Sequence, residues 1–100
     1  MNVTDFRTTL TKPNPPRGLA PAVAALWWAA KGDWDKAHRI VMKEESRDAA
    51  WVHAYLHRVE GDLDNAGYWY RRARRAAASG RLEAEWEAIA ADLIAQAQTP

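Results

Sequence analysis

Apolar residues recur at three- and four-residue steps from position 21 to the C-terminus, which is the spacing of amphipathic helices. Stop or cap residues near Gly32, Glu45, Gly61 and Ser79 divide this pattern into five stretches. We therefore predict an all-α protein with about five helices and no paired strands. The fifth helix is expected to fray at Thr99-Pro100.

Each predicted helix has one apolar face, and most begin at a residue that favours N-caps. The fourth stretch is expected to run to Ser79-Gly80 and to turn Leu63, Ala66, Tyr70, Ala73 and Ala77 inward. The fifth, a closing helix, is expected to turn Leu82, Trp86, Ile89, Leu93 and Ala97 inward. Capping also explains Asp33, Asp62 and the only two serines, Ser46 and Ser79, better than a nucleophile or a catalytic carboxylate pair does.

Four of the five prolines lie between Thr11 and Pro21, so that segment cannot be helical. We interpret residues 1–20 as an extended, proline-rich N-terminal arm and residues 21–100 as a helical domain. The large apolar residues of the arm, Phe6 and Leu10, either dock on the helical body or lie free.

Two helix junctions are copies of each other: Gly32-Asp33-Trp34-Asp35-Lys36-Ala37 and Gly61-Asp62-Leu63-Asp64-Asn65-Ala66. A glycine that ends one helix, an aspartate that caps the next and a small alanine one turn later are the parts of a tight αα-hairpin. We therefore expect Ala37 and Ala66 to be buried where the two helices of a hairpin cross.

The segment from Ala50 to Ala73 resembles a tetratricopeptide repeat in its small Ala54, its Gly61-Asp62 turn, Ala66 and Ala73, and aromatic Tyr70. The hairpin from Ala20 to Glu45 is similar but looser, and the 29-residue period is shorter than the 34 residues of the family. From Phe6 onward, the chain also looks like a group of small uncharacterised bacterial proteins that carry Gly-Asp-Trp-Asp-Lys-Ala-His and Trp-Val-His-Ala-Tyr-Leu-His-Arg. These resemblances imply stacked hairpins whose first helices line a concave side, and they imply no activity.

Composition and charge narrow the classes of function. The net charge of +1 gives no overall field that would attract nucleic acid or an anionic membrane. The absence of cysteine excludes disulfides, thiolate metal sites and a cysteine nucleophile. The sequence has no apolar run of about 20 residues, as a membrane span needs, and its start lacks the order of a signal peptide. We therefore expect a cytoplasmic protein with no membrane partner.

Three histidines form the first candidate for chemistry. His53 and His57 are four residues apart on one helix face, and His38 is available from the preceding helix as a third metal ligand. No general base lies between the pair, as it would in H-E-x-x-H. We favour a structural role, with no metal or cofactor and with at least one ring buried against an aromatic side chain.

A second candidate combines Tyr68-Trp69-Tyr70 with four arginines between Arg71 and Arg75, residue types that bind RNA. Helical geometry spreads these arginines over more than half of the circumference. We favour a solvated basic turn that pairs with Glu83, Glu85 or Glu87, so nucleic acid is disfavoured as a partner.

The remaining candidate is a surface for a partner. If the hairpins stack as the resemblance implies, Trp51, Tyr55 and Arg58 form a stripe on the concave side, with Leu26 as a neighbour; His53 and His57 complete the expected partner-binding set. We predict a non-enzymatic interaction module for an unidentified protein or peptide, with a homodimer left open. The alternatives are a small-ligand-binding or metal-dependent enzyme built on the histidines, RNA binding, and a stripe that serves only for packing.

Overall fold

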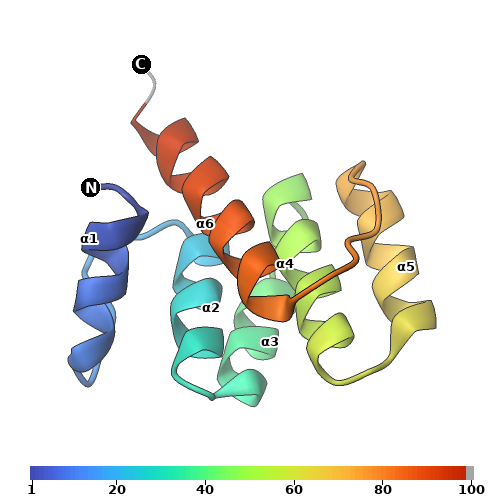
Figure 1. Ribbon diagram of the computed structural model, residues 1–100, viewed down its shortest axis with the longest axis horizontal. Coiled ribbons are helices and arrows are strands. Elements are labelled where there is room, and N and C mark those ends of the chain that lie inside the picture. Colours follow the sequence, from blue (N-terminus) through green and yellow to red (C-terminus); the bar gives the residue numbers. More distant parts are fainter. Residues whose placement is uncertain (99–100) are drawn as a thin grey trace.

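The computed structural model describes residues 1–98, and these contain helices and no strand (Figure 1). The elements are α1 (Val3–Thr8), a 3-10 turn η1 (Thr9–Thr11), α2 (Pro21–Ala30), α3 (Trp34–Met42), α4 (Arg47–Val59), α5 (Leu63–Ala73) and α6 (Leu82–Ala97). The all-α prediction is confirmed, with one helix more than expected. No helix of the described part is long and apolar enough to cross a membrane. The expected fraying at Thr99-Pro100 lies outside the described residues.

The helices form two hairpins, α2–α3 and α4–α5, and α6 packs across α2 and α4 (Figure 1). The two hairpin turns have the same geometry: Gly32 and Gly61 both have φ of +84°, a left-handed conformation that favours glycine. Asp33 and Asp62 each accept a hydrogen bond from the backbone N–H three residues later. The sequence repeat is therefore also a structural repeat.

Small residues allow each hairpin to close. Ala37 and Ala66 have 0% and 2% of their surface exposed, which confirms their predicted burial. Leu63, in contrast, was expected on the inner face and is 68% exposed. Trp34 takes the same place in the first hairpin and donates its indole N–H to the Leu56 carbonyl of the next hairpin, at 2.7 Å. Leu63 has no such neighbour because, after α5, the chain turns back to α6 instead of adding a third hairpin.

The N-terminal segment is not an extended arm throughout, which corrects the sequence prediction. The Asn2 side chain accepts from the Asp5 backbone N–H at 2.8 Å, and the Asp5 carboxylate accepts from the Asn2 N–H at 3.2 Å; this capping box starts α1. Phe6 is wholly buried in the common core and stacks on Trp86, with 5.8 Å between ring centroids. Of the stretch predicted to be non-helical, residues 12–20 contain no helix, whereas Thr11 ends the 3-10 turn and Pro21 begins α2.

The end of α5 and the start of α6 also differ from the prediction. Although alanines come next in the sequence, α5 ends at Ala73, and Arg74 takes the left-handed conformation with φ of 58°. The next residue explains the early end, because Arg75 pairs with Asp92 of α6 at 2.9 Å and lies over the Trp51 ring. These contacts direct the chain off the helix axis toward α6. Ser79 therefore lies in the connecting segment and caps nothing, whereas Ser46 caps α4 as predicted.

Candidate functional site

The predicted stripe on α4 lies beneath α6, and its three members have different surroundings. Tyr55 is 8% exposed, and its neighbour Leu26 on α2 is wholly buried. Burial, together with the nearby Glu85 carboxylate, raises the pKa of the Tyr55 hydroxyl to about 12, so this group stays neutral. Arg58 donates to the Glu85 carboxylate at 2.9 Å and to the Gly80 carbonyl. Arg58 therefore joins α4 to α6 and to its connecting segment, and Tyr55 is part of the core.

Trp51 is half-buried and borders a cavity of about 320 Å³ between α4, the connecting segment and α6. The walls include Arg75, Ala78, Ala84 and Glu85. The Arg75 guanidinium carbon lies 3.8 Å from the centroid of the Trp51 ring, within the range of a cation–π contact. Of the stripe, Trp51 is the residue that a partner can reach without moving α6.

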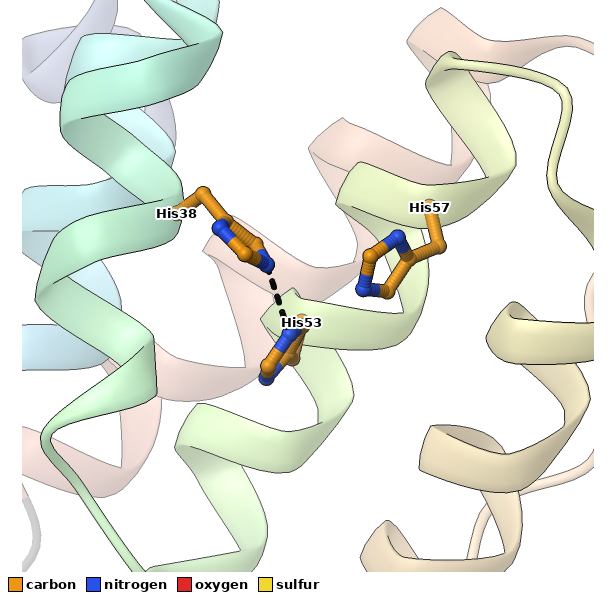
Figure 2. Close-up of side chains that lie close together, drawn as sticks. All are labelled: His38, His53 and His57. Carbon is orange, nitrogen blue, oxygen red and sulfur yellow. Dashed lines mark hydrogen bonds between the residues drawn. The ribbon is translucent and has the colours of Figure 1, made fainter.

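The three histidines meet between the two hairpins, as Figure 2 shows. His53 and His57 stack on each other from successive turns of α4, with 4.9 Å between ring centroids. His38 of α3 completes the group: its Nε2 lies 3.0 Å from the His53 Nε2. One nitrogen from each ring lies within 4.8 Å of the other two. The two histidines of α4 are almost inaccessible, since 4% of the surface of His53 and 6% of that of His57 is exposed, and His38 is half-buried.

Aromatic side chains and one carboxylate set the ring orientations. His38 stacks on Trp34 at 4.6 Å, and His53 stacks on Trp69 of α5 at 3.9 Å, with interplanar angles of 16° and 15°. The second contact confirms the prediction that a histidine is buried against an aromatic ring. His57 Nδ1 lies 2.6 Å from the Glu60 carboxylate. Sequence reasoning named the histidines but did not place Trp34, Trp69 or Glu60 against them, although the three-residue step from His57 to Glu60 on one helix predicts a contact between those two residues.

The surroundings keep at least two of the rings uncharged at neutral pH. Burial is the main cause, with the neighbouring histidines second, and together they lower the pKa of His53 to about 4. The pKa of His38 is also lowered, by burial and then by His57. A neutral imidazole presents one N–H and one free electron pair, which is the form that binds metals. A second set of groups in the same region, His57, Glu60 and Asp62, also has close ligand atoms, but its carboxylates are exposed.

The arginines of the basic turn, residues 71–75, contact different parts of the chain. Arg72 lies over the rings of Tyr68 and Trp69 and donates to the Tyr68 hydroxyl at 2.9 Å. Arg75 pairs with Asp92 and not with any of the three glutamates proposed from the sequence. Those glutamates contact other arginines: Glu83 with Arg81, Glu85 with Arg58, and Glu87 with Arg7. Two of the four arginines, Arg72 and Arg75, therefore contact aromatic or acidic side chains of the chain itself.

Comparison of the chain with models of protein families, with curated proteins and with solved structures finds no match in any of the three.

Proposed function

We propose that this chain is a non-enzymatic interaction module, a tetratricopeptide-like pair of hairpins that binds a protein or peptide segment in the cytoplasm of a bacterium. The observation that carries the proposal is the half-buried Trp51 at the edge of a cavity, beneath the Arg75 guanidinium. Tryptophan and arginine are the residue types that most often dominate binding energy at interfaces. The first helices of both hairpins already hold one apolar helix, α6, through Trp86, Ile89 and Leu93.

The walls of this cavity suggest what a partner must offer. Trp51 and the neighbouring alanines form an apolar floor that suits a large apolar side chain. Arg75 is available to a carboxylate of a partner, because the side chains of Arg75 and Asp92 are both about 40% exposed and ion pairs this exposed contribute little to stability. We therefore propose a peptide in which a bulky apolar residue stands next to an acidic one. A partner of this kind would replace Asp92 on Arg75 without moving α6.

Selection from a displayed peptide library tests the proposal without a known partner. Selected peptides should contain the apolar and acidic residues, and Trp51→Ala should weaken their binding at least about tenfold. The matched control is Trp28→Ala, which removes another half-buried tryptophan from α2. Both variants must melt cooperatively. A library that yields no binder, or binders that tolerate Trp51→Ala or lose equal affinity with Trp28→Ala, would contradict the proposal.

A further inference from the structure

The histidine cluster has the spacing of a metal site. In a tetrahedral site with metal–nitrogen bonds of about 2.1 Å, neighbouring ligand nitrogens are separated by about 3.4 Å. The nitrogens of His38 and His53 are already 3.0 Å apart, and all three rings offer a nitrogen within 4.8 Å of the others. Small side-chain rotations that move the ring nitrogens by about one ångström would therefore bring all three within bonding distance of a common ion. The view in Figure 2 shows the rings arranged around one space between α3 and α4.

The surroundings of the cluster also resemble those of a metal site. The Glu60 carboxylate takes the Nδ1 side of His57, which leaves Nε2 to face the other two rings. A carboxylate that holds the outer nitrogen of a histidine is the usual outer partner of a metal-bound imidazole. Trp34 and Trp69 fix the planes of His38 and His53 by stacking, so little ring freedom is lost when a metal binds.

From this geometry we propose that His38, His53 and His57 bind one divalent transition-metal ion, zinc in the first instance, through three imidazole nitrogens. Zinc accepts three histidines together with a fourth ligand such as water. The half-buried His38 marks the side from which that fourth ligand enters. None of these residues lines the Trp51 cavity, so the proposed metal site does not depend on the proposed peptide binding.

Such an ion would connect the two hairpins. His38 belongs to the second helix of the first hairpin, whereas His53 and His57 belong to the first helix of the second. An ion bound only by the folded arrangement stabilises that arrangement in proportion to the logarithm of its concentration over the dissociation constant. Zinc should therefore raise the melting temperature of this protein as well as bind to it.

The test uses untagged, full-length protein that has been stripped with a chelator and then dialysed against zinc. We expect one zinc per chain and a higher melting temperature with zinc. His38→Gln and His53→Gln should each weaken binding more than about 100-fold, and Glu60→Gln, which removes an outer partner, about 10- to 100-fold. Arg39→Gln, an exposed neighbour of His38 on α3, is the matched control and should bind zinc as the wild type does.

Two results would overturn the proposal. One is the absence of stoichiometric zinc on the folded wild type at a free concentration of about 0.1 mM. The other is binding that His57→Gln abolishes but that His38→Gln and His53→Gln leave intact, since this would assign the ion to His57, Glu60 and Asp62. If a variant fails to fold, the cobalt-loaded wild type provides the test. The proposal then requires the visible absorption bands of four-coordinate cobalt and perturbed NMR signals from the rings of all three histidines.

Discussion

Replacement of Phe6 by alanine tests whether the N-terminal helix belongs to the core. Phe6 is wholly buried and stacks on Trp86, which in turn donates its indole N–H to the Leu26 carbonyl at 2.9 Å. Loss of a buried phenylalanine removes its burial energy and leaves a cavity, so we expect Phe6→Ala to lower the free energy of unfolding by about 3 to 5 kcal/mol. That is a large part of the total stability of about 5 to 15 kcal/mol for a domain of this size.

Urea denaturation monitored by circular dichroism measures this effect. Phe6→Leu keeps most of the volume and should lose less than about 1.5 kcal/mol. Thr4→Ala is the matched control, because Thr4 lies on the same helix with an exposed side chain. If Phe6→Ala unfolds at the same urea concentration as Thr4→Ala, α1 contributes nothing to the core and the reasoning is wrong.

Two further predictions concern hairpin packing and pH. Ala37→Leu and Ala66→Leu should each destabilise by about 1 to 3 kcal/mol in thermal melts, because both sites lack room for a larger side chain; unchanged melting in both variants would refute the repeat alignment. Metal-free protein should lose stability as the pH falls from 6.5 toward 4, because His53 takes up a proton near 6.5 when unfolded and only near 4 when folded. The loss is on the order of 3 kcal/mol, fades as the pH rises above 6.5, and should be smaller in the urea titrations of His53→Gln, where the lowered pKa of His38 remains.

Local sequence signals made the hairpins predictable, whereas the differences between structure and prediction depend on contacts between residues far apart in the sequence. The Gly-Asp turns carry their own stop and cap, so the breaks at Gly32 and Gly61 could be predicted from a few residues. The exposure of Leu63 depends on the return of the chain from α5 to α6, and the early end of α5 depends on the contacts of Arg75 with two other helices. The capping box of α1 was present in the sequence, but the short helix it starts is held by burial of Phe6, which local pattern does not reveal.

The same distinction applies to the candidate site. The four-residue step from His53 to His57 places both rings on one face, and this could be predicted from the sequence alone. The approach of His38 depends on the register of α3 against α4, which the sequence pattern does not specify. Conversely, the stripe of Trp51, Tyr55 and Arg58 was correctly placed on one face of α4, but the pattern could not show that α6 covers two of its members.

The contact between α1 and α6 changes how this chain unfolds. An open array of hairpins can lose its end repeats one at a time, because each repeat touches only its neighbours. Here α6 bridges both hairpins, Phe6 packs on Trp86, and the Gln98 side chain donates to the Met1 carbonyl. Helices α1 and α6 are thereby joined, and because α6 contacts both hairpins, opening of either hairpin disrupts contacts of α6. We therefore expect unfolding to be a single cooperative event and refolding to depend on contacts between residues far apart in the sequence.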